Sequence, residues 1–146
     1  MHTFRHYSPR SVDSVIDCTD PLGIWYKPRR SGCLWFASGR AWPDLVAREE
    51  MRFDCSVEHD VTFNRLGFIY WITADTIESF TNRFGSLNEY GDMMIDWDSV
   101  RGAGYHGVHI DGGALASGFS WTSSWDIPSG VIWCGSNVSI TQSGSR

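Results

Sequence analysis

The sequence contains no run of about 20 apolar residues, the length that a membrane-spanning helix needs. Its first residues also lack the apolar core of a secretory signal peptide, so we expect a cytoplasmic protein with no membrane partner. The net charge of -5 and the pI near 5.4 argue against a surface that neutralises phosphate backbones, because nucleic-acid binders usually present a basic face. A short basic segment, KPRR at residues 27–30, is the local exception.

Cysteine is scarce, and its four positions are widely spaced: Cys18, Cys33, Cys55 and Cys134. No C-x-x-C pair occurs, so neither a zinc site nor a dithiol redox motif has its usual spacing. We therefore expect free thiols, most of them buried, as is usual for a cytosolic protein.

The sequence motifs of several large enzyme classes are also missing. There is no P-loop, no G-x-G-x-x-G turn, no H-E-x-x-H and no G-x-S-x-G. The closest histidine pair is His106 and His109, and a spacing of three residues on a strand turns two side chains toward opposite faces. We therefore predict no metal site.

The chain has 146 residues, enough for one hydrophobic core, and it is rich in tryptophan, with eight residues. Tryptophan buries a large area in a small core, and its flat face also stacks on sugars and bases. We expect one globular domain over residues 1–142, followed by a frayed tail at 143–146.

Local patterns predict short strands separated by short helices. Alternating or β-branched and aromatic segments indicate strands at residues 2–7, 33–38, 60–66, 68–72, 105–110, 117–122, 130–133 and 137–141. Capping residues and apolar spacings of three and four indicate helices at residues 11–17, 41–53, 73–85 and 95–104. Because this order does not alternate regularly, it predicts an α+β fold with a split or bent, mostly antiparallel sheet and a few short helices.

Four segments spread along the chain suggest a family. They are HYS at 6–8, GCLWFASGRAW at 32–42, YHGVHI at 105–110 and WDIPSGVIW at 125–133. Together they resemble the ADP-ribosyltransferase superfamily, in particular its small phage and bacterial toxin-like members. The resemblance implies the fold of that superfamily, with NAD as a substrate and a protein or a nucleic acid as the acceptor of ADP-ribose.

The resemblance also assigns candidate binding residues. It places His6 where the family has a residue that hydrogen-bonds a ribose of NAD, with Tyr7 and Ser8 beside it. It aligns Trp35, Phe36 and Ser38 with the segment that walls the nicotinamide, and it makes Trp125 a second candidate wall. Because Trp35 and Phe36 are neighbours on a strand, only one of them can face the pocket.

The catalytic position departs from the family pattern. The resemblance implies a glutamate just before the apolar residues of the last core strand, where this chain has Ser129 and Gly130. The nearest acid is Asp126. An acid is needed because breaking the bond between ribose and nicotinamide develops positive charge on the sugar, as in glycoside hydrolysis. Asp126 and Ser129 are therefore the candidate catalytic residues, and enzymatic activity stays an open question.

Four functions fit these residues. The first is an NAD-dependent ADP-ribosyltransferase-like protein that modifies a macromolecule. The second is a non-catalytic module that binds NAD or a related nucleotide in order to sequester or sense it. A tryptophan-rich carbohydrate-binding domain and a protein-interaction domain with an aromatic hot spot are the third and fourth.

Overall fold

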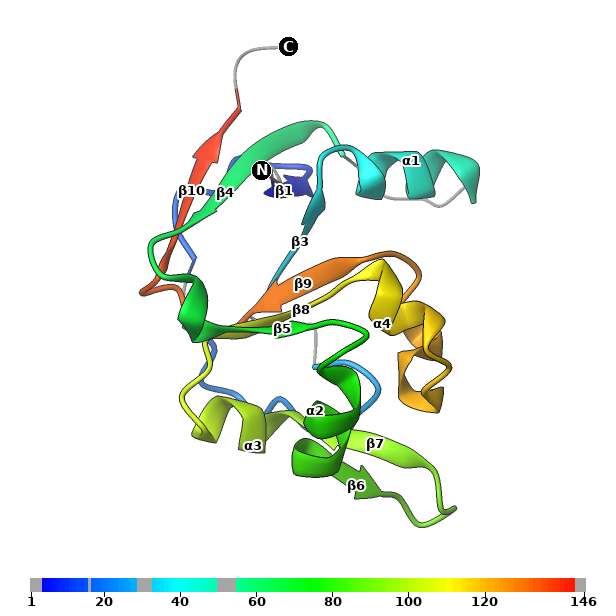
Figure 1. Ribbon diagram of the computed structural model, residues 1–146. Helices are drawn as coiled ribbons and strands as arrows, with labels where there is room; N and C mark the ends of the chain where they lie inside the picture. Colours follow the sequence, from blue (N-terminus) through cyan, green and yellow to red (C-terminus); the bar gives the residue numbers. More distant parts are fainter. Residues whose placement is uncertain (1–3, 16, 29–32, 50–54, 144–146) are drawn as a thin grey trace.

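The computed structural model describes residues 4–15, 17–28, 33–49 and 55–143, and its main element is a seven-stranded sheet (Figure 1). The strands of this sheet are β1 Phe4–Ser8, β3 Leu34–Ser38, β4 Val57–Phe63, β5 Ile69–Ile72, β8 Gly107–Ile110, β9 Ser129–Ile132 and β10 Val138–Gln142. They lie in the order β10-β4-β1-β3-β9-β8-β5. All neighbouring strands are antiparallel except β5 and β8, which run parallel.

A smaller sheet and several short helices form a second layer. The smaller sheet has the order β2-β7-β6, with β2 Ile24–Trp25, β6 Gly85–Leu87 and β7 Met93–Asp96. The α-helices are α1 Ala41–Arg48, α2 Ile77–Phe84, α3 Trp97–Gly102 and α4 Gly112–Ala116, and single 3-10 turns occur at η1 Leu66–Phe68 and η2 Ser120–Ser124. In Figure 1, α2 and α3 lie between β5 and the smaller sheet.

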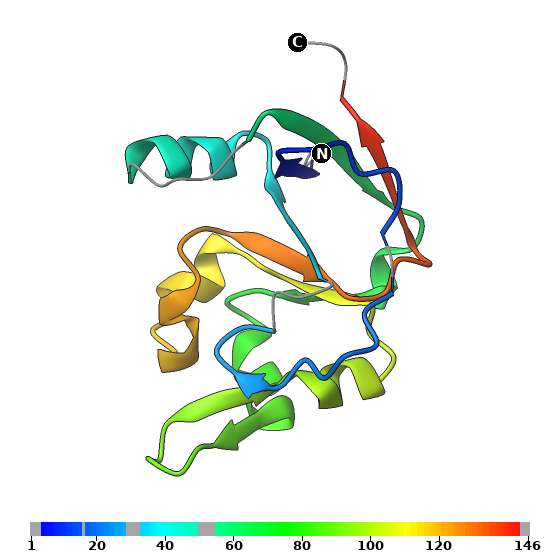
Figure 2. The same cartoon turned by 180° about the vertical axis from the view of Figure 1, so that it is seen from behind.

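The larger sheet is curled, and each of its faces covers a hydrophobic core. Figure 2 shows β10, β4 and β1 bending away from the plane of β9, β8 and β5. The concave face of the curl encloses a core that includes Phe36, Val61 and Ile132. The opposite face packs on the second layer through a larger core, in which Trp97 and Trp133 are fully buried. The expected α+β class with a bent, mostly antiparallel sheet and few short helices is confirmed.

The predicted strands at residues 2–7, 33–38, 68–72, 105–110 and 130–133 correspond to β1, β3, β5, β8 and β9, and those at 60–66 and 137–141 overlap β4 and β10. The predicted helix at 73–85 is α2, which buries Ile77, Phe80 and Phe84 at helical spacing. The predicted helix at 41–53 is α1 as far as Arg48, and residues 50–54 lie outside the described residues.

The helix predicted at residues 11–17 is wrong, because residues 11–15 and 17 have no helical structure. The backbone N–H of Val12 donates to Nε2 of His59 at 2.8 Å, and the N–H of Cys18 donates to the Trp133 carbonyl at 2.7 Å. His59 lies on β4 and Trp133 directly follows β9, so tertiary contacts outweigh the local helix preference.

The strand predicted at residues 117–122 is also wrong. This segment ends in η2, where Trp121 is fully buried and its indole N–H donates to Oγ1 of Thr81 at 3.0 Å. Of the predicted tail, the N–H of Ser143 still donates to the Glu58 carbonyl, and residues 144–146 lie outside the described residues. No helix in the described part of the chain is long and apolar enough to cross a membrane.

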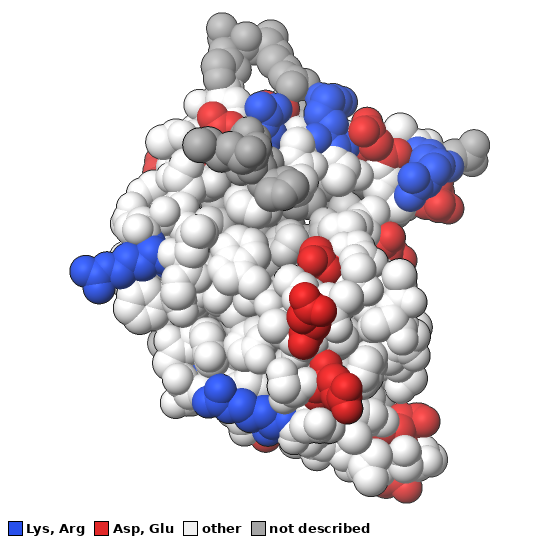
Figure 3. All heavy atoms as spheres, in the orientation of Figure 1, with Lys and Arg blue, Asp and Glu red and all other residues white. Residues whose placement is uncertain are grey.

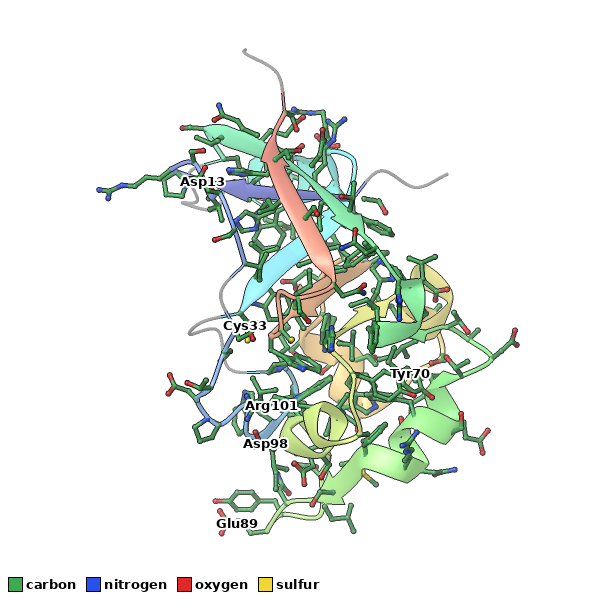
Figure 4. All side chains as sticks on the ribbon, turned by 90° about the vertical axis from the view of Figure 1, so that its left-hand side faces the viewer. Asp13, Cys33, Tyr70, Glu89, Asp98 and Arg101 are labelled. Atoms are coloured by element: carbon green, nitrogen blue, oxygen red, sulfur yellow. The ribbon has the colours of Figure 1, made fainter. Side chains whose placement is uncertain are left out.

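The segment that leads into β2 is fixed by an ion pair on α3. The Asp98 carboxylate accepts the backbone N–H groups of Leu22 and Gly23 at 2.9 and 3.1 Å. Arg101 donates to Asp98 at 2.8 Å and to the carbonyl of Cys18 at 3.0 Å (Figure 4). Partial burial opposes ionisation of Asp98, but the two N–H groups and Arg101 outweigh it and lower the pKa of the carboxyl.

We predict that Asp98→Asn lowers the free energy of unfolding by about 1 kcal/mol at neutral pH, because a charged acceptor is lost from a partly exposed network. The folded pKa of Asp98 lies below the unfolded value of about 3.9, so its contribution is complete above that pH and disappears as the pH falls through the folded value. Urea unfolding from about pH 5 to pH 2 should show the variant and the wild type converging. A constant difference over that range would contradict the assignment, and the exposed Asp75→Asn serves as the control.

Candidate functional site

Strand β3 lies near the middle of the large sheet and divides the candidate residues between its two faces. Phe36 is 2% exposed and packs in the concave core, where its ring lies 5.3 Å from that of Phe4 and 5.8 Å from that of His109. Trp35 points the other way and packs against the larger core. The expectation that Trp35 and Phe36 point to opposite faces is thus confirmed, whereas the pocket that one of them would line stays a prediction.

Trp35 meets Trp125 and Lys27, and we call these three residues the tryptophan–lysine site. The ring centroids of Trp35 and Trp125 are 5.4 Å apart, with a tilt of 54°. The Lys27 ammonium lies 5.8 Å from both centroids. Cation–π contacts of this kind contribute about 0.5–2 kcal/mol. Lys27 is the sole lysine of the sequence.

Each member of the tryptophan–lysine site comes from a different segment. Trp35 is on β3, Trp125 follows η2, and Lys27 follows β2 of the smaller sheet. The Trp125 indole N–H donates to the Tyr26 carbonyl at 3.0 Å, which fixes the backbone next to Lys27. The site therefore joins the large sheet to the second layer.

The indole nitrogen of Trp35 is the unusual feature of the site. It is buried, and none of the described residues accepts a hydrogen bond from its N–H. Buried donors in folded proteins nearly always have a partner, because leaving one unpaired costs about 1–3 kcal/mol. A ligand oxygen is one acceptor that would satisfy this group.

His6 lies on the concave side of β1, facing His59 across the strand pair. Nδ1 of His6 is 2.6 Å from the carbonyl of Trp35, so Nδ1 carries the proton and Nε2 is left as an acceptor. Burial lowers the pKa of His6, the Trp35 carbonyl opposes this in part, and His59 lowers it further. His6 is therefore neutral at pH 7 and is tied to the backbone of Trp35.

The tautomer of His59 follows from its two neighbours. Nε2 accepts the N–H of Val12 at 2.8 Å, and Nδ1 lies 3.2 Å from the His6 carbonyl. Nε2 must then be unprotonated, and Nδ1 must donate. His59, which is fully buried, is a structural residue that orders the strand carrying His6.

Tyr7 is on the opposite face of β1 from His6 and belongs to a buried network. Its hydroxyl donates to Glu58 Oε2 at 2.9 Å and lies 3.2 Å from the Gly39 carbonyl. Arg5 donates to Glu58 Oε1 at 2.7 Å. Burial and the bond to Glu58 raise the pKa of Tyr7. Because the Tyr7 side chain is only 4% exposed and is held by this network, it shares no face with His6.

The two candidate serines near β1 and β3 stand at strand ends. The Ser8 hydroxyl donates to the carbonyl of Arg10 at 2.5 Å, which stabilises the turn after β1. Ser38, half-buried, is the last residue of β3 and lies opposite Phe4 in the strand pair. Among the described residues, no hydrogen bond connects either serine side chain to Trp35 or Trp125.

The candidate catalytic residues differ in exposure. Asp126 is exposed and directly follows the buried Trp125 in the sequence. Ser129 is buried, and its hydroxyl donates to the Ile127 carbonyl at 3.0 Å. Of the two residues, Asp126 alone offers a solvent-accessible functional group.

Gly130 occupies the place next to Ser129 where the family pattern implies an acid. Its strand neighbours are Phe36 on one side and His109 on the other. A Cβ atom at residue 130 would lie 2.1 Å from Cζ of Phe36, well inside van der Waals contact. The Phe36 ring therefore occupies the space that a longer side chain at residue 130 would need.

Sequence reasoning missed Lys27, Glu58 and His59. The signal for Lys27 was weak but present, because it is the single lysine and lies among aromatic residues in IWYKP. Glu58 and His59 lie on adjacent positions of β4, and their roles depend on contacts about 50 residues away in sequence, with Tyr7, Val12 and His6. No local pattern contains that information.

The charges on the face of the molecule shown in Figure 3 are mixed. Figure 3 shows one face of the molecule, with arginine or lysine and acidic side chains interspersed at its upper edge and acidic groups beside a large uncharged area. On this face the cations do not form the continuous stripe that a long polyanion would need.

The chain matches no protein-family model, no curated protein and no solved structure. The function is therefore inferred from the residues and their geometry.

We predict that Gly130→Ala destabilises the protein by about 1–3 kcal/mol, because the new methyl group displaces the Phe36 ring in a packed core. Thermal unfolding measures the effect. Gly102→Ala is the matched control, since a Cβ there meets no atom within 4 Å and alanine favours the helix by up to about 1 kcal/mol. Equal thermal midpoints for the two variants would contradict the prediction, because they would show that the Phe36 ring moves aside at no cost in stability.

Proposed function

We propose that this protein binds NAD at the tryptophan–lysine site and acts as an ADP-ribosyltransferase-like protein on a macromolecular acceptor. The observation that carries the proposal is the buried Trp35 indole N–H, unpartnered among the described residues, beside a second indole and an ammonium group. Indole faces suit a planar base, an ammonium suits a pyrophosphate, and the N–H suits an acceptor oxygen.

Binding exchanges one set of contacts for another. Lys27 now lies over both indole rings, and such contacts are worth about 0.5–2 kcal/mol. A charge-assisted hydrogen bond to a phosphate oxygen is worth about 1.5–3 kcal/mol, so a swing of Lys27 from the rings to a pyrophosphate is favourable. The half-buried ring of Trp35 would then accept the base of the nucleotide, beside the buried ring of Trp125.

His6 has an indirect role in this proposal. It is on the other face of β1, and its link to the site is the hydrogen bond to the Trp35 carbonyl. His6 thus holds the backbone of Trp35, and its Nε2 offers an acceptor on the concave side. Direct contact with a ribose requires the ligand to pass around the end of β3, so we assign His6 to positioning and keep ribose contact as the family expectation.

Transfer of ADP-ribose requires an acid near the reacting ribose, and Asp126 is the candidate for this acid. Its carboxylate is exposed next to Trp125, where it can stabilise the positive charge that forms as nicotinamide leaves. The bond between ribose and nicotinamide breaks, nicotinamide leaves with the bonding electron pair, and an acceptor nucleophile attacks the ribose carbon.

The contact between Gly130 and Phe36 favours a second candidate function, the non-catalytic nucleotide-binding module. That contact leaves no room for a glutamate at residue 130, and the Ser129 hydroxyl is already engaged by Ile127. A chain that keeps the base-binding residues without the usual acid would sequester or sense the nucleotide.

The tryptophan positions give little support to a carbohydrate-binding surface. Trp25 is the single exposed residue among the eight tryptophans, at 58%, whereas Trp97, Trp121, Trp125 and Trp133 are 4% exposed or less. Stacking of sugars calls for exposed, coplanar rings. The protein-interaction alternative rests on exposed apolar side chains of the second layer, such as Trp25 and Leu87.

The binding prediction is tested with two conservative variants. Lys27→Met should weaken NAD binding roughly tenfold or more, because a charge-assisted hydrogen bond is lost. Trp35→Phe should weaken it several-fold, because the ring stays while the N–H donor goes. Saturation-transfer NMR on the adenine and nicotinamide protons, with titration, measures both, and Trp25→Phe is the control. NAD affinity unchanged in both variants would remove the tryptophan–lysine site from the proposal.

The catalytic prediction concerns Asp126 alone. Asp126→Asn should leave NAD affinity within about twofold while nicotinamide release falls at least a hundredfold, because removing an electrostatic stabiliser of the transition state costs about 3 kcal/mol. Free nicotinamide is followed by proton NMR, and Glu89→Gln on an exposed turn is the control. Binding without release in the wild type would favour the non-catalytic module, and full release in the variant would place the acid elsewhere.

A further inference from the structure

Two cysteines from separate segments meet at the edge of the larger core. Cys18 lies in the segment between β1 and β2, and its backbone N–H donates to the Trp133 carbonyl at 2.7 Å. Cys33 directly precedes β3, whose Leu34 pairs with Ile132 of β9, so the antiparallel register sets Cys33 opposite Trp133. Both cysteines therefore lie beside Trp133, the residue that directly follows β9.

The two thiols are close to one another. Cys18 is 9% exposed in the larger core, and Cys33 packs against that core. Burial, followed by the charge and hydrogen bond of the Cys18 thiol, raises the pKa of Cys33 to about 12, against the opposing effect of Arg101. Figure 4 shows Cys33 next to the blue N-terminal segment that precedes β2.

We propose that Cys18 and Cys33 form an oxidation site, in which a disulfide closes the 18–33 segment onto the end of β3. The segment between them contains β2 and Lys27. In the reduced state it is held at the Cys18 side by the hydrogen bonds of Arg101 and Asp98, whereas the disulfide adds a covalent link to the large sheet. Oxidation would thus fix both ends of the loop that carries Lys27.

The other two cysteines are placed differently. Sγ of Cys134 lies 3.4 Å from Oγ of Ser136, which directs this thiol toward the β9–β10 connection. Cys55 directly precedes the residues that lead into β4 and is not in either large core cluster of the described residues. Cys18 and Cys33 are therefore the pair that the fold brings together.

The oxidant is a small-molecule disulfide such as oxidised glutathione. One cysteine thiolate attacks a sulfur of the oxidant, forms a mixed disulfide and releases one glutathione thiolate. The second cysteine thiolate then attacks the protein sulfur and releases the other. Two protein thiols are oxidised to one disulfide, the oxidant is reduced to two thiols, and the two protons pass to glutathione.

A tryptic peptide map distinguishes every possible pair. Arginines at 10, 29, 30, 40, 52, 65 and 101 place each cysteine in a different tryptic peptide, and cleavage at Arg29 or Arg30 falls inside the 18–33 loop. The full chain is incubated with oxidised glutathione at a mildly alkaline pH, the remaining thiols are blocked, and the peptides are identified by mass spectrometry with and without reductant.

We expect one cross-linked pair, joining the peptide of Cys18 to that of Cys33, and a thermal midpoint higher by roughly 5 °C in the oxidised protein. Both effects should disappear in Cys33→Ser and persist in Cys55→Ser and Cys134→Ser. A link between Cys33 and Cys134, glutathione adducts without a cross-link, or four unmodified thiols would each overturn the proposal. The result does not depend on NAD binding, so failure here leaves the proposed function untouched.

Discussion

The organisation of the molecule depends on the alternation of side chains along β3. This strand lies between β1, which pairs with Ala37 and Ser38, and β9, which pairs with residues 34–37. Phe36 enters the concave core and lies over Gly130, where no larger residue fits, while Trp35 enters the opposite core. A shift of one residue in register would exchange these side chains, which the packing of both cores forbids.

The second layer determines what Trp35 can do. Its smaller sheet is joined to the large one through the segment before β2, which Asp98 and Arg101 fix from α3. That anchoring brings Lys27 over Trp35 and Trp125, although Lys27 itself lies in a loop. The arrangement combines a strand-borne aromatic ring with a long, charged side chain from a loop, and loops on a rigid scaffold are a common basis for ligand recognition.

The sequence predicted those parts of the fold that have a local signature. Short apolar runs bounded by glycine, serine or proline identified β3 and β9, and helical spacing identified α2 through Phe80 and Phe84. The segment at 11–17 has helix-compatible residues, yet Val12 bonds to His59 on β4, so a non-local contact decided its structure. Strands of two to four residues, such as β2, are too short for any period to be detected. For the site, alternation separated Trp35 from Phe36, whereas Lys27 and Glu58 acquire their roles through the tertiary fold alone.

The position of the acid separates the two nucleotide hypotheses in physical terms. A carboxylate on β9 at residue 130 would lie in the concave core beside Phe36 and His109, in a low-dielectric place where ionisation is costly. Asp126 lies before that strand, directly after Trp125 in the sequence, and is exposed to water. Water weakens its effect on a developing positive charge, but a bound nucleotide that covers Trp35 and Trp125 would also exclude water from the adjoining carboxylate. In the proposed function the acid and the indole pair are therefore coupled, because a ligand that stacks on the rings would also create the environment in which Asp126 acts.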